Sequence, residues 1–408
     1  MKKLLFIFIS LFIFTTITYA RDFPIDVTAE NVAVIDLDDN TIVLEKNADD
    51  PVVLASLAKM FTAYTIINHV DNLNQRIEIT EEDIYALWGF TQIGLEEGDK
   101  LTYMDLLYAM MLYSAADASQ ALANAYSDNK IDNFIKVVNQ DVKSLGLEHT
   151  VLNDTFGRDD GDISTARELA EFLKIALQND TFKKIFTTTQ KRLSNGKEAI
   201  NYTKSIASYY GLDSSKLLGN KPGYTEVAGL LLASYVRING TNYGIIVCKS
   251  KENDNLSTHV LDTYKIIDYL EDHPYKERTI LKKGSLLKRI NVEDSTIDEY
   301  AVAVTKDIVV YLTDDEYNNL EYDYHIVDSI TPNNVMGDNL GYLDIISNGK
   351  VIATYNVHLG DDIFIPPSKS RIMIVVILGF IFFIICMMAA NLFANKKNNW
   401  FQLFFLFT

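Results

Sequence analysis

The sequence has few of the residues that build disulfides, metal sites and nucleic-acid surfaces. Its 408 residues include two cysteines and six histidines, with no CxxC or HxxxH pair, so a zinc site or another cofactor has no support. Cys386 lies in a long apolar run, and we therefore expect no disulfide between it and Cys248. The chain has 37 Lys and Arg residues and 55 Asp and Glu residues, and the resulting net charge of −18 argues against nucleic acid as a partner.

The two ends of the chain are apolar. Lys2 and Lys3 precede an apolar stretch that closes on Thr18-Tyr19-Ala20, the layout of a secretory signal, and we expect a signal peptide over 1–20. Residues 372–393 carry no charge, and about 20 apolar residues span a bilayer. We therefore predict a transmembrane anchor over 367–395 and a cytoplasmic tail over 396–408. The rest of the chain would be exported and held at the outer side of the cell membrane, with the lipid bilayer as a partner through the C-terminal helix.

The residues between these ends predict two domains. Two short strands surround Asp38-Asp39-Asn40, and two longer ones surround Asn239-Gly240 within 228–250. Between them, apolar residues recur at helical spacing after Thr102, small residues interrupt the pattern at Ser114, and Thr165 with Glu168 reads as a capping box. A further helix is expected from about Thr258 to Leu270. This order predicts an α+β fold, an antiparallel sheet with helices packed on it, over 21–273.

The residue pattern of the chain changes after His273-Pro274. Strand patterns dominate from there, with a hairpin around Asn348-Gly349. We expect a small all-β domain over 274–366.

One lysine stands out in "PVVLASLAKMFTAY" (51–64), which otherwise reads as a buried helix. Lys59 lies three residues after Ser56, so both fall on one helix face and can touch. Burial disfavours the charged ammonium, and a neutral amine can take the proton of a neighbouring hydroxyl and make it a nucleophile. The alternative is a lysine whose stem packs while its head reaches water, because S-x-x-K is a short and common pattern.

Three later segments give this pair a context: "LEEGDKLTYMDLLYAMMLYSAADASQALA", "LNDTFGRDDGDISTARELA" and "GNKPGYTEVAG". In this order and spacing, residues 29–270 resemble the D-alanyl-D-alanine carboxypeptidases, the low-molecular-mass penicillin-binding proteins of serine peptidase family S11. The β domain and the membrane anchor also resemble that family's arrangement. The resemblance implies a penicillin-binding/β-lactamase-like transpeptidase domain, followed by a small all-β domain and a C-terminal transmembrane helix.

The resemblance also implies roles for individual residues. Ser56 would be the acylated nucleophile, Lys59 its general base and Ser114 a proton relay. Lys221 would line the site and attract the substrate's terminal carboxylate. The backbone N–H groups of Ser56 and Tyr224 would form the oxyanion hole, and Gly223, Thr225 and Ala116 would complete the substrate-binding residues.

Two positions depart from the family's motifs. Ala116 stands where the family has the asparagine of S-x-N, and Pro222 stands where it has the threonine of K-T-G. Pro222 lacks a hydroxyl and a backbone donor, although proline is tolerated on an edge strand. His259 lies near where many relatives place a carboxylate-binding arginine. These changes are expected to slow turnover, because one lost polar contact costs about 1–3 kcal/mol when a buried partner is left unpaired.

The expected function is that of a serine D-Ala-D-Ala carboxypeptidase that trims pentapeptide stems of peptidoglycan and is acylated by β-lactams such as penicillin. The alternatives are an impaired homologue that binds wall stems or partners without turnover, and a β-lactamase. No GxSxG pattern occurs, which argues against an α/β-hydrolase. Asp159, Asp160 and Asp162 do not fit the spacing of an EF-hand, and we expect them to form a solvated acidic loop.

Overall fold

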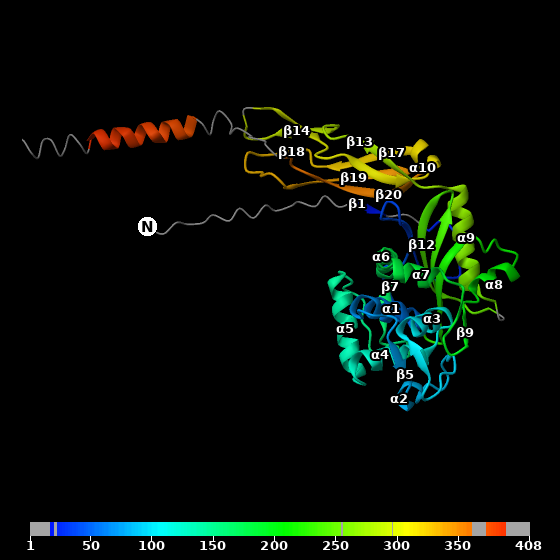
Figure 1. Cartoon of the computed structure of the whole chain (residues 1–408). Helices are drawn as coiled ribbons and strands as arrows, with labels where there is room; N and C mark the ends of the chain where they lie inside the picture. Colours follow the sequence, from blue (N-terminus) through cyan, green and yellow to red (C-terminus); the bar gives the residue numbers. More distant parts are fainter. Residues whose placement is uncertain (1–16, 20–22, 254–255, 296, 361–372, 389–408) are drawn as a thin grey trace, which may run out of the picture. The chain divides into compact units, whose positions relative to one another are not determined.

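The computed structural model describes residues 17–19, 23–253, 256–295, 297–360 and 373–388 (Figure 1). It forms two compact units. The larger runs from Asp22 to Tyr275, and the smaller combines the N-terminal residues up to Arg21 with the chain from Lys276 onward. Most of the signal peptide predicted over 1–20 lies outside the described residues.

The larger unit is built on a five-stranded antiparallel sheet in the order β10-β11-β12-β2-β3. Its strands are β2 (Asn31–Asp36), β3 (Thr41–Lys46), β10 (Leu217–Thr225), β11 (Gly229–Ile238) and β12 (Thr241–Ser250). The pairing of Asp36 with Thr41 and of Ile238 with Thr241 confirms both predicted hairpins. Strand β10 lies at one edge of this sheet.

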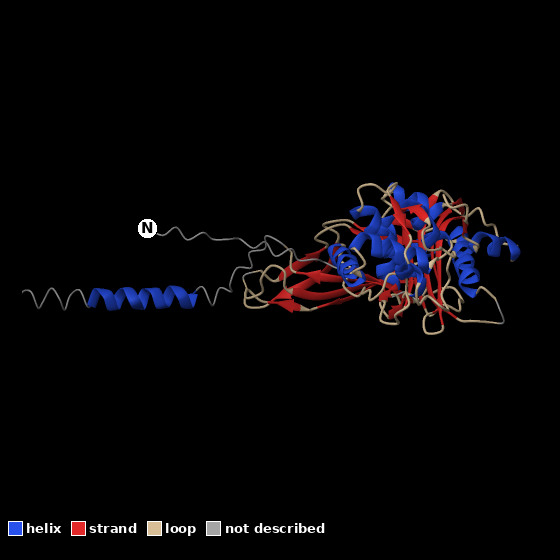
Figure 2. Cartoon of the chain, turned by 60° about the horizontal axis from the view of Figure 1, so that its bottom comes forward, coloured by secondary structure: helices blue, strands red, loops and turns tan. Residues whose placement is uncertain are grey.

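Helices cover the sheet on two faces. Every residue of β2 is buried, which a strand achieves only when both of its faces are covered. Helices (blue) flank the strands (red) of this unit in Figure 2. Helix α6 (Ala166–Ala176) packs on β2 and β12, and helix α9 (Thr258–Asp272) packs on β11 and β12. The prediction of an antiparallel sheet with helices packed on it is confirmed.

Most of the remaining helices of the larger unit form a second layer around α1 (Ala58–His69). They are η1 (Ala55–Leu57), α2 (Glu81–Ile84), α3 (Tyr103–Leu112), α4 (Ala116–Ser127), α5 (Ile131–Ser144) and α7 (Asp180–Thr187). Helix α8 (Thr203–Tyr209) packs instead on α9 and β10. Three short strand pairs accompany them: β4 (Pro51–Val53) with β7 (Ile163–Thr165), β5 (Arg76–Glu78) with β6 (Lys100–Thr102), and β8 (Gln190–Arg192) with β9 (Glu198–Ile200).

Local signals fix where two of these helices begin. The Thr102 hydroxyl accepts a hydrogen bond from the Asp105 N–H, so α3 begins where predicted. The capping box predicted at Thr165 is only half formed, because its hydroxyl accepts the Glu168 N–H but the Glu168 carboxylate points elsewhere. That carboxylate accepts hydrogen bonds from the N–H of His149 and the hydroxyl of Thr150 instead, tying the preceding loop to α6.

The smaller unit is mainly β. Strands β1 (Ile17–Tyr19), β17 (Leu320–Ile326), β19 (Asn339–Ser347) and β20 (Lys350–His358) form one sheet in the order β1-β20-β19-β17. Two smaller sheets accompany it. In one, β13 (Lys276–Leu281) pairs with β16 (Ile308–Leu312), and in the other, β14 (Leu286–Val292) lies between β15 (Glu299–Ala303) and β18 (Ser329–Ile330). One short helix, α10 (Asp314–Asn318), lies among them. The β19–β20 pairing confirms the predicted hairpin at Asn348-Gly349.

The C-terminal apolar run is described only in part. Residues 373–388 form an exposed helix, while the flanking parts of the predicted anchor and the predicted tail lie outside the described residues. Within the described ranges, no helix combines the length and the apolar character needed to cross a membrane. The predicted transmembrane helix therefore has no support in the described structure.

Candidate active site

Ser56 lies in η1, the short 3-10 turn that leads into α1. The residue before it, Ala55, has a φ of +42°, a conformation that non-glycine residues rarely adopt. Such strain persists where the surrounding structure holds it, and here Gly157 packs directly on the Ala55 carbonyl. The half-buried Ser56 side chain is thereby held at the start of the helix.

The amine of Lys59 contacts the Ser56 hydroxyl. Its Nζ lies 2.9 Å from Ser56 Oγ and donates a second hydrogen bond of 2.8 Å to the carbonyl oxygen of Phe156. Only 2% of the Lys59 side chain is exposed, which excludes the alternative in which its head reaches water. The predicted contact between Ser56 and Lys59 is confirmed.

Burial changes the protonation of Lys59. Removal from water lowers its pKa to about 7, against the opposing effect of the carboxylates of Asp154 and Asp117. A substantial fraction of the amine is therefore neutral near neutral pH. A neutral amine 2.9 Å from a hydroxyl oxygen can accept its proton.

A loop from Asp154 to Asp162 supports Lys59 through the Phe156 carbonyl. Both carboxylate oxygens of Asp154 accept backbone N–H groups, from Phe156 and Gly157 on Oδ1 and from two further residues on Oδ2, each at 2.7 Å. This cluster of hydrogen bonds curls the loop so that its carbonyl points at the amine. Sequence reasoning missed Asp154, whose only signal was its place at the start of a polar, glycine-containing segment.

Asp162 is a correction to the predicted solvated acidic loop. Asp159 and Asp160 are exposed, but Asp162 is fully buried. Its Oδ1 accepts the N–H groups of Asn153 and Asp154, and its Oδ2 has no hydrogen-bond donor among the described residues. Burial, and then the charge of Asp154, raise the pKa of Asp162 to about 8, so this carboxyl is mostly protonated at pH 7.

A second serine–lysine pair lies beside the first. Lys221 is fully buried on β10, and its Nζ donates to Ser114 Oγ at 2.9 Å and to the Pro222 carbonyl at 3.0 Å. Burial lowers the pKa of Lys221 well below its usual value, and the charge of Lys59 acts in the same direction. Ser114 joins α3 to α4 with a φ of +63°, a second strained residue in this site.

Strand β10 passes directly over the Ser56 backbone. A Cβ on Gly223 would lie 3.3 Å from Ser56 N and 3.5 Å from Leu57 N, so only glycine allows this approach comfortably. Tyr224 follows with its side chain about half exposed, and the Thr225 hydroxyl accepts the Ala228 N–H at 3.0 Å, which shapes the β10–β11 turn. The oxyanion-hole role of Tyr224 remains a prediction.

The departures from the family's motifs are accommodated differently. Ala116 is fully buried and packs with Leu87 and Phe156, so apolar contacts fill the space around the missing amide. Pro222 lies on the edge strand, where a missing N–H is tolerated. His259 lies buried on α9, its Nδ1 lacks a partner among the described residues, and burial lowers its pKa to about 4.

Two serine–lysine contacts under one sheet edge define a site for acyl transfer. Ser56 lies in η1 and Lys59, whose pKa is lowered, lies in α1; Ser114 lies at the α3–α4 junction and the buried Lys221 lies on β10. This arrangement, on an antiparallel sheet with helices on two faces, defines the class of serine enzymes that share the S-x-x-K mechanism.

Known proteins place the chain within that class. The family described as D-alanyl-D-alanine carboxypeptidase matches residues 17–251, and the family described as penicillin-binding protein 5, C-terminal domain, matches residues 275–363. The first match covers more than half of the 408 residues. The chain therefore belongs to the D-alanyl-D-alanine carboxypeptidase family of serine peptidases.

Individual relatives agree with this assignment. The chain is 25% identical to the D-alanyl-D-alanine carboxypeptidase DacF of Bacillus subtilis over 82% of this chain and 85% of the relative. It is 28% identical to a D-alanyl-D-alanine endopeptidase of Haemophilus influenzae over 53% of this chain and 74% of the relative. The fold resembles that of the carboxypeptidase DacD of Francisella tularensis, with a TM-score of 0.63 and 17% identity over 86% of this chain and 97% of that one.

Proposed function

We propose that this chain removes the terminal D-alanine from pentapeptide stems of peptidoglycan, through an acyl-enzyme formed on Ser56. The observation that carries the proposal is the buried Lys59 amine, 2.9 Å from the Ser56 hydroxyl and with a pKa lowered to about 7. Family membership supports the substrate, because the matching relatives are named for D-alanyl-D-alanine.

In the first half of the reaction, neutral Lys59 takes the Ser56 proton, and Oγ attacks the carbonyl carbon of the penultimate D-alanine. The backbone N–H groups of Ser56 and Tyr224 would stabilise the oxyanion, and such donors are worth about 3–4 kcal/mol each. The carbon–nitrogen bond then breaks. The leaving amine takes a proton delivered through Lys59 and the neighbouring Ser114–Lys221 pair, and D-alanine departs.

In the second half, water attacks the ester carbonyl, a neutral amine at the site accepts the water's proton, and Ser56 Oγ leaves with a proton. The substrate's terminal carboxylate would favour the ammonium form of Lys221 and pair with it, while the hydrogen bond to Ser114 keeps the amine at the site. β-Lactams carry a comparable carboxylate and a strained amide, so penicillin would acylate the same oxygen.

We also propose that the enzyme acts outside the cell and is held at the membrane. The support comes from the sequence: the signal-like segment at 1–20, and the uncharged run at 372–393 followed by Lys396 and Lys397. Protease treatment of intact cells tests this proposal. It would degrade an exported catalytic domain and spare one retained inside.

Fluorescent penicillin tests the proposed reaction. Wild-type protein is expected to carry the label covalently, and the Ser56→Ala variant is expected to carry none. The Ser144→Ala variant is the matched control, because the Ser144 hydroxyl is exposed and contacts only the Asp141 carbonyl of its own helix. Folded wild-type protein that takes up no label would contradict the proposal.

A further inference from the structure

A three-residue strand from the signal-like segment lies at the edge of the smaller unit. Strand β1 lies beside β20 and pairs with it in the antiparallel direction (Figure 1). The paired residues are Ile17 with Tyr355, Thr18 with Thr354 and Tyr19 with Ala353. The sequence predicts a cleavage after Ala20, which would remove this strand from the mature protein. The strand pairing and the predicted cleavage are therefore in conflict.

The register of β1 matches the two faces of the sheet. Ala353 and Tyr355 are buried in the core of the smaller unit, and Thr354 between them is half-buried. Residues directly opposite each other in an antiparallel pair lie on the same face of the sheet. Positions 17 and 19 therefore share the core-facing side of β20, and position 18 shares the other side. The sequence Ile-Thr-Tyr has the apolar–polar–apolar alternation that this placement requires.

Strand β20 needs a neighbour on this side. Residues 351–357 contain no charge and no proline, the features by which an exposed edge strand avoids pairing with another molecule. A register shift disturbs the strand at Ile352, but residues 353–357 pair regularly with β19. Without β1, β20 would present a regular, uncharged edge, which favours self-association.

The opposite edge of the same sheet carries the protection that β20 lacks. β17 is the last strand of this sheet among the described residues, and its ionisable side chains Glu321, Asp323 and His325 are all exposed. Such side chains on an edge strand disfavour the addition of a further strand. The difference between the two edges indicates that β1 is the part of the fold that covers β20.

The strand stays in place only while it is joined to the rest of the chain. Three paired residues make a marginal contact by themselves, because short isolated strand pairs are barely stable in water. A covalent link raises the effective concentration of the strand to the order of millimolar. A cut between Ala20 and Arg21 would remove that link, and the separated segment would dissociate from β20.

We infer that the mature protein keeps residues 17–19 as the outer strand of the smaller unit, so that the bond between Ala20 and Arg21 stays intact. The cleavage pattern at Thr18-Tyr19-Ala20 then serves as part of the fold. The segment can still direct export, because Lys2, Lys3 and the apolar run after them are present in the precursor. Retention of this strand is independent of the reaction proposed for Ser56.

The first residue of the exported protein tests this inference. Intact cells that produce the full chain are treated with a membrane-impermeant biotin reagent, and the labelled molecules are purified for N-terminal sequencing and intact mass. A first residue at or before Ile17 is expected. Labelled molecules that begin after Ile17, at Arg21 above all, would overturn the inference and leave the proposed export intact. An absence of labelled molecules would contradict both.

Paired substitutions test the contact between the two strands. Ile17→Asp/Tyr19→Asp places charges at the core-facing positions of β1 and leaves Thr18 and Ala20, the two positions of the cleavage pattern, unchanged. Ile17→Val/Tyr19→Phe keeps the apolar pattern and is the matched control. Hydrogen exchange of the β20 amides is expected to be about tenfold faster in the aspartate variant than in the control, with no change in β11 of the larger unit. Equal exchange of β20 in the two variants would show that β1 does not cover this strand and would overturn the inference.

Discussion

Gly157 lies so close to Ala55 that a Cβ on Gly157 would be 1.7 Å from the Ala55 carbonyl oxygen. Ala55 is the strained residue directly before Ser56, and Gly157 follows the residue whose carbonyl binds Lys59. One contact between two backbones therefore sets the positions of Ser56 and Lys59 together. A side chain at position 157 would force the loop and the helix apart.

Gly157→Ala is expected to destabilise the protein and to prevent acylation. A left-handed conformation costs alanine about 1–2 kcal/mol anywhere, and the clash with Ala55 adds a further 1–3 kcal/mol or more. The matched control is Gly196→Ala, since Gly196 has a similar φ of +89° with nothing within 4 Å of its missing Cβ. Urea unfolding and penicillin labelling measure both effects. Equal losses of stability in the two variants would show that the close contact is unimportant.

The pH dependence of acylation should follow Lys59. Its pKa of about 7 lies below the usual value of a lysine, so the neutral base form grows as the pH rises through 7. The second-order rate of penicillin acylation is expected to rise about tenfold per unit below pH 7 and to level off above it. Stopped-flow labelling between pH 5 and 9 measures the curve, and a rate that still rises tenfold per unit up to pH 9 would contradict a base whose pKa is lowered to about 7.

Lys59→Arg complements that profile. A guanidinium stays protonated in proteins, so it cannot act as a base, although it keeps the positive charge. Labelling is expected to fall at least a hundredfold at every pH, in line with the usual contribution of a general base. Lys136→Arg, an exposed position on α5, should label like the wild type.

Sequence reasoning identified the features that depend on local spacing. The S-x-x-K spacing puts Ser56 and Lys59 on one face of a turn, and that contact follows from helix geometry alone. The hairpins at Asn239-Gly240 and Asn348-Gly349 could be predicted for a similar reason, because these residue pairs readily adopt the positive φ values that tight turns require.

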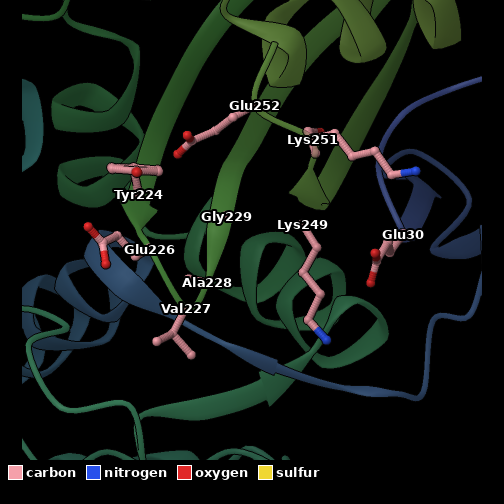
Figure 3. A pocket seen from close by; sticks show the side chains of 10 residues that line it. Glu30, Tyr224, Glu226, Val227, Ala228, Gly229, Lys249, Lys251 and Glu252 are labelled. Carbon is pink, nitrogen blue, oxygen red and sulfur yellow. The ribbon is translucent and has the colours of Figure 1, made fainter.

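The parts that sequence reasoning missed depend on contacts between distant segments. Asp162 looked like its exposed neighbours Asp159 and Asp160, and only the packing of the loop shows that it is buried. Glu168 had the spacing of a capping box, but the loop at Thr150 competes for its carboxylate. The charged residues that line the pocket beside Tyr224 (Figure 3) come from strand ends separated by more than twenty residues, and no local pattern links them.

Restoring the family's asparagine at position 116 is expected to harm the protein. Ala116 is fully buried against Leu87 and Phe156, so a larger polar side chain would overpack the cluster and leave its amide poorly hydrogen-bonded. Ala116→Asn should lower the free energy of unfolding by about 1–3 kcal/mol. Ala125→Asn, on the same helix but only half buried, controls for helix propensity. A stable Ala116→Asn variant with faster D-alanine release would show instead that the site retains room for the amide.

Asp162 should make the protein less stable as the pH rises. Its pKa is raised to about 8 in the folded protein, above the usual value of 3.8, so folding favours the protonated form. The stabilisation that the protonated form contributes is complete below pH 4, falls as the pH rises toward 8 and is absent above pH 8. Its full size is about 1.4 kcal/mol per unit of pKa difference between the folded and unfolded states. Asp162→Asn keeps the shape and stays neutral, so it should remove this pH dependence and be more stable than the wild type at pH 9. Asp160→Asn, at an exposed neighbour, should unfold in urea like the wild type at each pH. Parallel curves for the wild type and Asp162→Asn between pH 4 and 9 would contradict a protonated Asp162 carboxyl in the folded protein.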